Sequence, residues 1–591
     1  MMANFKKFIQ EHKLILANAV LLALLMVAPL IAFPIMTKDT YQGINIANHG
    51  FDELWYLSRA KEALDGNAMG NALIREGKNK PDPYYNYVEK AVFAPFRVLG
   101  IAEHVNVATV YAVLNAVGVF LLALLIYFFV WQISGSKILA VANSLLIIGG
   151  YAIATPSLLL SINVYSRAMT PYIPLVFTFL YLNFLVKVLR QKSWKHAGCG
   201  GAALGILFYI YFYAWSYIFV LNASLILFCL IKKEYSYIKY ILAMSGIGFL
   251  LGAYNIFNII LSHQGELGRQ LSYFHWVVYS HAPVFNAVGF ICLLLLGITW
   301  TKFKKDRNFF LFSSFILAGW LVLNQHVITG TMLQFGHYYQ HFVIPTSIIV
   351  VTYLIWMILK KTRHQKLLFA AIVLFVYANT ILGQYRAVLT NYQAKQDRQQ
   401  YVPIIDYLNK EDGSGVVLAA DDADEYVVTI YTPHDLFWSR SFLIVNVPLE
   451  ERLRDTLYVY LYLNAESRNN FEPYLRAILA PAEYRQYISP FYRGIYEALE
   501  GYSSGLTYDE YYEKAALKDE LILKQREVLI KSLAAGYNSL MKSGHGIAGF
   551  MEKYGITYVI WDKDKNPEWD VSALNAAEVA SSNKIFLYKV N

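Results

Sequence analysis

Charged residues are scarce in this chain. Only 16% of its 591 residues are Asp, Glu, Lys or Arg and 57% are hydrophobic, whereas an ordinary soluble domain contains about 25% charged residues. A larger soluble core does not explain the difference, because single cores stop growing at about 250–300 residues and longer chains divide into domains. The composition therefore excludes an ordinary soluble protein and favours one that buries apolar surface in a bilayer.

Cysteine is rare as well. Cys199, Cys229 and Cys292 lie in apolar stretches, where cysteine behaves as a small buried hydrophobic residue, so no disulfide framework is indicated. The sequence also lacks a Gly-rich phosphate loop, a nucleophile elbow and a nucleic-acid-binding motif. Nothing therefore indicates a nucleic-acid partner.

Acidic residues are missing above all from the first two thirds of the chain. Residues 1–384 contain 13 acidic and 29 basic residues, whereas residues 385–591 contain 29 acidic and 22 basic ones. This asymmetry predicts two domains, a basic transmembrane domain (1–384) and a mildly acidic soluble domain (385–591).

Apolar runs fill the first of these domains, and most are long enough to cross a bilayer. They predict a polytopic α-helical membrane protein with about eleven transmembrane helices, although no charge separates the fifth run from the sixth. The predicted segments are 14–35, 105–131, 137–155, 170–189, 198–217, 218–231, 238–261, 284–301, 308–324, 342–360 and 367–384.

Basic residues gather in alternate loops between these segments. Basic loops stay in the cytoplasm. The pattern therefore predicts a multi-pass protein of the cytoplasmic membrane of a prokaryote, with its N-terminus inside and its C-terminal domain outside. The basic loops are Lys6–Lys7, Lys137, Arg190–Lys195, Lys232–Lys239, Lys302–Arg307 and Lys360–Lys366.

The parts outside the membrane have their own predicted elements. The long first external loop, 36–104, is expected to hold helices at Asp52–Asp65 and 87–100, and the soluble domain is expected to be an α/β or α+β module. In that module we expect strands at Val416–Ala419, Tyr426–Tyr431, Tyr558–Trp561 and Ile585–Val590, and helices at 449–464, 472–480 and 507–541.

The first external loop holds nine of the 13 acidic residues of the membrane part, and Asp52-Glu53 is its only adjacent acidic pair. Such a pair at a helix start can simply cap the helix, where the positive end of the dipole favours negative charge. Trp55, Tyr56 and Leu57 follow directly and press the helix against the membrane surface. A carboxylate in a partly dehydrated pocket there can take a proton from a hydroxyl group.

The residues around Asp52 also resemble a known motif. They resemble the first external loop of GT-C-fold glycosyltransferases, in particular the protein O-mannosyltransferases and the enzymes that transfer aminoarabinose to lipid A. In the latter a Lys-Pro follows the motif, as Lys80-Pro81 does here, although Asp82 departs from the usual second Pro. The pattern in this chain is His49-Gly-Phe-Asp52-Glu53-x-x-Tyr56-x-x-x-Ala60-x-Glu62-x-x-x-Gly66.

The resemblance implies a GT-C-like fold and an inverting glycosyl transfer at the outer membrane face. The implied donor is a sugar on polyprenyl phosphate, and the implied acceptor is a protein, a lipid or an envelope glycan. Asp52 is implied as the general base, with Glu53 as its neighbour. Metal-dependent oligosaccharyltransferases carry a second acidic motif in a later loop, but 156–169 contains no acid here. A divalent metal is therefore disfavoured, although Glu266 leaves it open.

The donor phosphate needs cations, and Arg is suited to it because its fork binds phosphate through two hydrogen bonds. The candidates outside the membrane are Lys80, Arg167 and Arg269. Arg167 stands in an otherwise uncharged loop, where a charge is costly unless it is paired. Arg167 can therefore bind a phosphate, pair with an acid of the first loop, or extend its guanidinium to the membrane interface.

A second polar cluster, Asn324–His341, indicates a cavity lining. Its candidates for holding acceptor or phosphate, together with Tyr56, are His326, Gln334, His337 and Tyr338. His337 and His341 also have the i, i+4 spacing of a metal pair, but hydrogen-bonded histidines in an interfacial aromatic belt are the favoured interpretation.

Two other classes compete with the glycosyltransferase. A transporter or lipid-carrier flippase with an extracytoplasmic binding domain would show internal repeats and helices broken at mid-membrane, and neither is clear in the sequence. A catalytically idle scaffold would use only its outer domain for binding.

Overall fold

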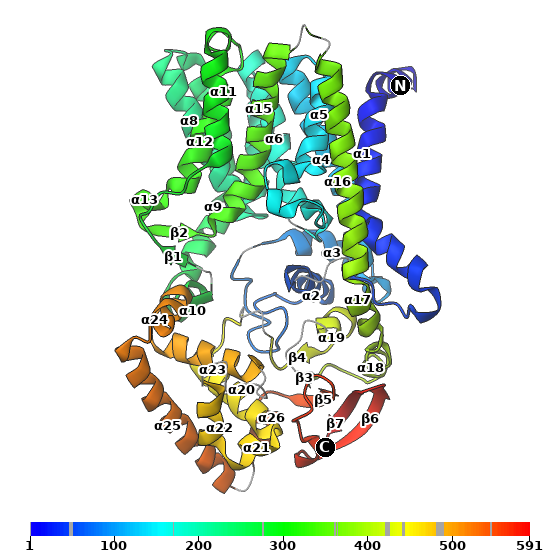
Figure 1. Ribbon diagram of the computed structural model, residues 1–591, viewed down its shortest axis with the longest axis vertical. Helices are drawn as coiled ribbons and strands as arrows, with labels where there is room; N and C mark the ends of the chain where they lie inside the picture. Colours follow the sequence, from blue (N-terminus) through cyan, green and yellow to red (C-terminus); the bar gives the residue numbers. More distant parts are fainter. Residues whose placement is uncertain are drawn as a thin grey trace.

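The computed structural model describes residues 2–591 except 47–50, 85, 170, 275–276, 360–361, 363, 420–425, 440–443, 480–489 and 544–545, and it leaves out the side chains of 2–5, 51, 52, 274, 277, 278, 333 and 490. Long helices form a bundle at one end of the molecule (top of Figure 1), and the C-terminal helices and strands lie at the other end. The N-terminus lies at the far end of the bundle from the C-terminal part, as the predicted topology requires. Which side faces the cytoplasm stays a prediction.

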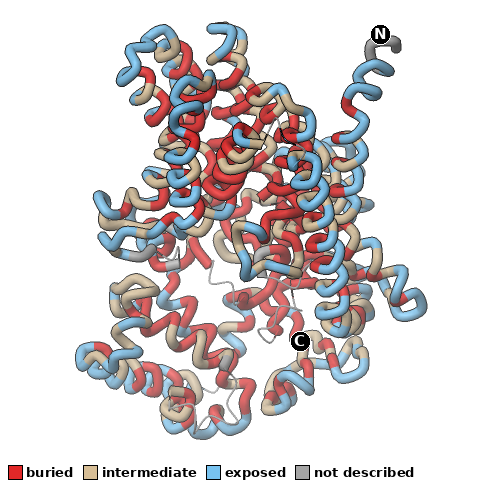
Figure 2. The backbone as a smooth tube through the Cα atoms, turned by 45° about the horizontal axis from the view of Figure 1, so that its top comes forward, coloured by how far each residue is buried: buried red, intermediate tan, exposed pale blue. Residues whose placement is uncertain are grey.

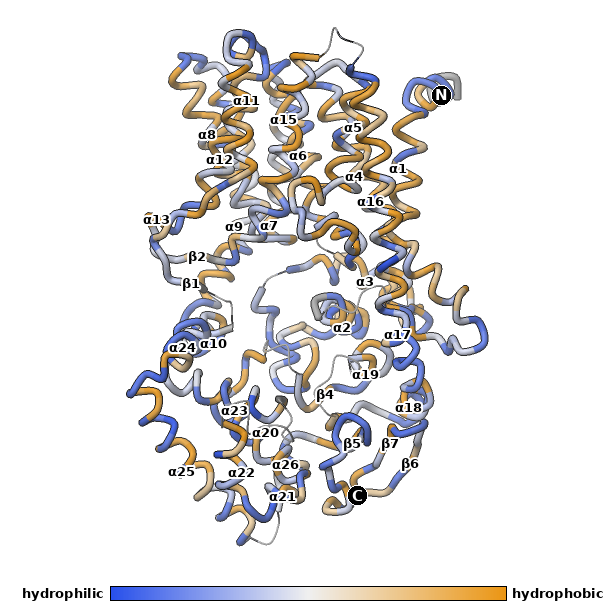
Figure 3. The backbone as a smooth tube through the Cα atoms, viewed as in Figure 1, coloured by the Kyte–Doolittle hydropathy of each residue, from blue (hydrophilic) through white to orange (hydrophobic). Residues whose placement is uncertain are grey.

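Each of the eleven predicted spans falls on a helix of the bundle, and hydrophobic residues dominate these helices (Figure 3). Among the described residues, eight helical segments are long and apolar enough to cross a membrane, and α5 and α11 are shorter apolar helices. The prediction of a polytopic helical membrane protein is confirmed. The helices are α1 (Met2–Thr37), α4 (Val107–Ser134), α5 (Lys137–Ile148), α6 (Tyr172–Gln191), α7 (Trp194–Phe208), α8 (Phe212–Ile231), α9 (Ile238–Ser262), α11 (Ala287–Phe303), α12 (Phe309–Asn324), α15 (Ile344–Leu359) and α16 (His364–Thr390).

Two predicted boundaries are wrong. The fifth and sixth spans meet at Tyr209–Tyr211 rather than at residue 217, because α7 ends at Phe208 and the chain turns there. The third ends early, at Ile148. Gly149 follows, and a Cβ atom there would lie 2.6 Å from the side chain of Val376 of α16, so the glycine leaves room for that side chain.

The first external loop packs into the C-terminal part. Its helix α2 (Phe51–Asp65) lies against α19 (Tyr426–Tyr431), and α3 (Val88–Val98) follows it. One cluster of buried residues contains Leu54 and Leu57 of the loop together with residues of the C-terminal strands and helices. Buried residues accordingly occur in the bundle and in the C-terminal part alike (Figure 2). The domain division at 384 stays a prediction, and α16 runs through it to Thr390.

The C-terminal part contains a five-stranded mixed sheet. Strands β4, β3 and β5 are parallel, and β7 and β6 add to β5 in antiparallel order. The strands are β3 (Val416–Ala419), β4 (Asp435–Leu436), β5 (Ile556–Asp562), β6 (Ala576–Ser582) and β7 (Ile585–Val590); the helices include α17 (Tyr392–Gln399), α18 (Val402–Leu408), α20 (Leu449–Leu463), α22 (Phe471–Ile478), α23 (Pro490–Ser503), α24 (Tyr508–Ala516), α25 (Glu520–Lys542) and α26 (Ala548–Lys553).

Most elements predicted for this part are confirmed, but the strand predicted at Tyr426–Tyr431 is wrong. This β-branched and aromatic segment forms helix α19, whose residues 426–430 are all buried. The preference of such residues for strands depends on context, and here packing against α2 decides the structure. The helix predicted at 507–541 is divided into α24 and α25, with a residue of positive φ, Lys518, between them.

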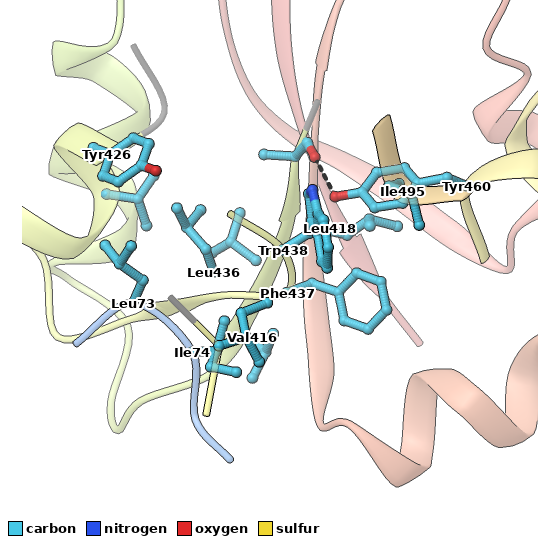
Figure 4. Packing of buried hydrophobic residues seen from close by; sticks show 14 of the residues in the cluster. Leu73, Ile74, Val416, Leu418, Tyr426, Leu436, Phe437, Trp438, Tyr460 and Ile495 are labelled. Atoms are coloured by element: carbon cyan, nitrogen blue, oxygen red, sulfur yellow. Dashed lines mark hydrogen bonds between the residues drawn. The ribbon is translucent and has the colours of Figure 1, made fainter. Parts of the chain in front are cut away.

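The sheet edge is where the first loop meets the C-terminal part. Figure 4 shows Leu73 and Ile74 of the loop beside Leu436 and Val416 of the sheet. The backbone N–H of Leu436 donates to the carbonyl of Leu73 at 2.8 Å. This contact holds the loop, and with it α2, in a fixed place below the bundle.

Candidate functional site

Several acids of the first loop are held in buried ion pairs. Arg59 of α2 contacts Asp82 at 2.6 Å and Glu89 at 2.7 Å, and all three side chains are buried. Buried charges persist in proteins when they are paired in this way. Asp82, which departs from the family pattern, therefore serves as a partner of Arg59 that fastens residues 82–89 to α2.

A second group of acids joins the loop to the C-terminal part. Lys78 contacts Glu62 at 2.8 Å and Asp435 at 2.6 Å, and Glu76 contacts Arg452 at 2.8 Å. Burial raises the pKa of Glu62 to about 7, although Lys78 opposes the shift. These carboxylates form ion pairs that connect the first loop to the C-terminal part, and we assign them this structural role.

Few acids of the loop remain for chemistry. Asp39 and Glu103 are exposed, and Asp65 pairs with Lys61 at the surface. Glu53 is buried, with 5% of its surface exposed. Asp52 lies in the first turn of α2, and its side chain lies outside the described part of the chain. Asp52 and Glu53 therefore stay the predicted catalytic pair, and Glu53 is its buried member.

Glu53 and Arg167 lie at the same cavity. It has a volume of about 10 Å³, room for about one water molecule, and Asn45 and Asn115 line it as well. The amide nitrogen of Asn115 donates to the carbonyls of Tyr165 and Arg167, at 2.6 and 3.0 Å. These two hydrogen bonds fix the loop that bears Arg167. The structure thus places the buried carboxylate of Glu53 and the predicted cation Arg167 at one cavity.

Sequence reasoning missed two further cations beside Glu53. Lys395 and Arg398 of α17 are both buried, with 4% and 1% of their surface exposed. Burial lowers the pKa of Lys395 to about 8, and Glu53 opposes the shift. Their i, i+3 spacing directly after the last span was the available signal, but the segment was assigned to a solvated domain.

Lys80 and Arg269 lie elsewhere. They line an open groove of about 740 Å³ between the first loop, α10 (Gly265–Phe274) and the C-terminal part. Arg269 contacts Glu266 at 3.2 Å and lies over the ring of Tyr502. Burial raises the pKa of Glu266, but hydrogen bonds from Tyr502, Gln270 and Arg269 outweigh it and lower that pKa overall. The structure therefore separates these two cations from Arg167.

The polar cluster at 324–341 does not form one site. The imidazole of His326 donates to the carbonyl of Ala282 at 2.7 Å, and Gln334 is exposed. His337 hydrogen-bonds to Tyr211, and the hydroxyls of Tyr338 and Ser216 share a hydrogen bond of 2.8 Å.

His341, at the end of this cluster, lies near Arg167. His341 is buried, and both His337 and Arg167 act on it electrostatically. Within the described ranges no three His, Cys, Asp or Glu side chains are grouped as metal ligands. Tyr56 is half-buried against Trp55, with ring centres 5.2 Å apart.

An apolar groove of about 490 Å³ lies next to this region. Tyr172, which lies within electrostatic range of Glu53, is part of its wall. Val117 and Leu121 of α4 are 50% and 43% exposed and form its outer edge, so the groove is open on the side that faces lipid. It is lined by Tyr87, Val88, Ala91, Val92, Leu114, Val117, Gly118, Leu121, Tyr172, Ile173, Val176, Phe177, Ile206, Tyr209 and Ile210.

Fold and site together define a polytopic helical membrane protein with a buried carboxylate and several cations at one end of its bundle. Among solved structures, the chain is similar to the crystal structure of the Archaeoglobus fulgidus oligosaccharyltransferase in complex with Zn and sulfate. The identity is 12% and the TM-score 0.40, and the match covers 71% of this chain and 62% of that one, less than two thirds of its length. No family model and no curated protein matches the sequence.

Proposed function

We propose that this chain is a membrane glycosyltransferase that moves a sugar from a polyprenyl-phosphate donor to a protein, lipid or envelope-glycan acceptor at the outer membrane face. One observation carries the proposal: Glu53, the neighbour of Asp52, shares a buried cavity with Arg167, and an apolar groove open to lipid lies beside them. A lipid-linked anion requires this combination of an apolar groove and a cation. The motif around Asp52 gives independent support.

In the proposed reaction Asp52 takes the proton of an acceptor hydroxyl. The hydroxyl oxygen then bonds to the anomeric carbon of the sugar, and the bond from that carbon to the phosphate oxygen breaks. The lipid phosphate leaves with the electron pair, and the configuration at the anomeric carbon is inverted. Cations at the departing phosphate stabilise its charge as it develops, and Arg167 is the first of them.

A transfer assay tests this function. Membrane fractions that contain the chain are incubated with a panel of radiolabelled polyprenyl-phosphate sugars, and we expect label from one of them in an acceptor. Label that crosses the bilayer but stays on its lipid for every donor would identify a flippase instead.

Arg167→Ala is expected to raise the donor concentration needed for half-maximal transfer by about 10–100-fold, because a hydrogen bond to a charged group contributes about 1.5–3 kcal/mol. Transfer rates over a range of donor concentrations measure it. Arg269→Ala is the matched control, since Arg269 lies in the other groove. An unchanged donor dependence in Arg167→Ala would remove Arg167 from the phosphate site.

Val117→Trp is expected to fill the apolar groove. Exclusion of two or three methylene groups of the donor from it costs about 2 kcal/mol, roughly a 30-fold loss of affinity for long-chain donors. Val113→Trp is the control, because Val113 is exposed on the same helix but does not line the groove. Equal transfer by both variants, measured with a long-chain donor, would mean that the lipid chain binds elsewhere.

A further inference from the structure

The side chain of Lys395 is a buried ammonium group. Its side chain is 4% exposed, and its Nζ finds no hydrogen-bond partner among the described residues. The ring of Phe33 at the end of α1 lies 5.2 Å from it. Burial of a charge is costly unless the charge is paired. The carboxylate of Glu53 acts on this ammonium, but the N–H groups of Nζ have no acceptor among the described residues, so they can donate to an anion that binds there.

The helix that bears Lys395 is fastened to the first loop. The side chain of Gln399 accepts from the backbone N–H of Gln42 at 3.0 Å and donates to the carbonyl of Ile44 at 2.8 Å. These bonds hold α17 against the chain that leads into α2. Figure 1 shows α17 below the end of α16, close to α2. The helix that bears Lys395 is therefore held beside the first loop.

Glu53 and Arg398 are the charged groups that act on Lys395 within the part of the chain that the structure describes. Glu53 also lines the cavity that contains Arg167. Glu53 is thus flanked by cations from two segments far apart in the sequence, the loop before α6 and the helix after α16.

We infer that Lys395 binds the phosphate of the lipid-linked donor together with Arg167. The inference rests on the proposed function and adds to it a cation from beyond the last membrane span. A departing phosphate monoester carries up to two negative charges, which one Arg does not balance. The cavity of Glu53 and Arg167 has room for about one water molecule, so a phosphate can enter only when side chains move. The side chain of Lys395 is flexible, which allows its ammonium to approach the bound phosphate.

The assignment places one phosphate-binding residue of the donor site in α17, after the last membrane span. Lys80 is one of the predicted phosphate-binding cations, but it is exposed in the other groove. Lys395 takes over that role from the opposite end of the membrane domain's sequence. The proposed donor site therefore combines residues from the first loop, the loop before α6 and α17.

A binding experiment on the full chain in lipid nanodiscs tests the assignment. The probe is a radiolabelled long-chain isoprenyl phosphate, with inorganic phosphate as a second arm. Lys395→Met keeps the shape of the stem and removes the charge, and we expect it to weaken isoprenyl phosphate binding about 10–100-fold near pH 7. Lys395→Arg restores most of the affinity, and the control Lys80→Met leaves binding unchanged.

The pH dependence gives a second readout. Because the pKa of Lys395 is lowered to about 8, the ammonium is present below that pH and is lost above it. Wild-type affinity is therefore expected to fall between about pH 7.5 and about pH 9.5, whereas Lys395→Arg, charged throughout, shows no such fall. Glu53 and Arg398 are the charged groups next to Lys395, and both are unchanged in Lys395→Arg. If Lys395→Met does not fold, the comparison of the wild-type and Lys395→Arg pH profiles tests the assignment instead.

Each result has one meaning. Wild-type binding that Lys395→Met leaves intact, or a flat wild-type pH profile, overturns the assignment and leaves the proposed function standing. A wild-type chain that binds no isoprenyl phosphate overturns both. Equal dependence on Lys395 for inorganic phosphate, with no preference for the lipid, overturns the assignment to a lipid-linked donor.

Discussion

Asp52→Asn is expected to lower sugar transfer by about 10²–10⁴-fold, the contribution of a positioned general base, and to leave donor binding intact. Asn keeps the size of the side chain but does not accept a proton from the acceptor hydroxyl. Single-turnover transfer and donor binding, measured on the same purified sample, separate the two effects. The choice of Asp52 follows from its place beside buried Glu53 and from the ion pairs that occupy most other acids of the loop.

Two variants serve as its controls. Asp65→Asn changes an acid of the same helix that pairs with Lys61 at the surface, and full activity is expected. Glu53→Gln tests the neighbour, and a loss of transfer in that variant alone would move the base from Asp52 to Glu53. Undiminished turnover in Asp52→Asn would remove Asp52 from the mechanism.

Arg59→Met is expected to destabilise the protein by about 3–5 kcal/mol, because it leaves two buried carboxylates without their cation. Asp82 and Glu89, the partners of Arg59, are 4% and 0% exposed. The change would loosen residues 82–89 from α2 and so disturb the place of Asp52. Thermal unfolding in detergent, followed by tryptophan fluorescence, measures it.

Lys61→Met is the matched control on the same helix, and a surface pair of this kind contributes at most about 1 kcal/mol. Combination of Arg59→Met with Asp82→Leu and Glu89→Leu removes all three charges and is expected to recover most of the loss, since apolar replacements of a complete buried group are often neutral. Equal unfolding temperatures for Arg59→Met and Lys61→Met would contradict the structural role of Arg59.

The helices of the bundle could be predicted because their signal is local. A run of apolar residues spans a bilayer whatever its neighbours are, and all eleven predicted segments coincide with helices. The predicted secondary structure was wrong where packing against neighbouring segments decides the conformation. Tyr426–Tyr431 has the composition of a strand, yet it forms a buried helix against α2. Helix α5 ends early, at Ile148, and Gly149 after it packs against side chains of α16.

The candidate site was predicted only in part for the same reason. Arg167 was identified because an Arg in an uncharged loop stands out, and the structure places it at the cavity of Glu53. Lys80 and Arg269 fit the chemistry equally well by residue type, but they lie in a different groove. Lys395 and Arg398 were overlooked because their i, i+3 spacing is equally typical of a solvated helix, and the local sequence does not show that both side chains are buried.

By itself, the sequence determined that the chain is a membrane protein, which segments form its helices, and that an acidic pair opens the first helix of a long external loop. These properties follow from composition and spacing over a few tens of residues. Only the tertiary structure decided which acids are taken up by ion pairs and which cations lie beside Glu53. Residues from α2, from the loop before α6 and from α17 meet through packing, and contacts between segments so far apart leave no mark on the sequence around any one of them.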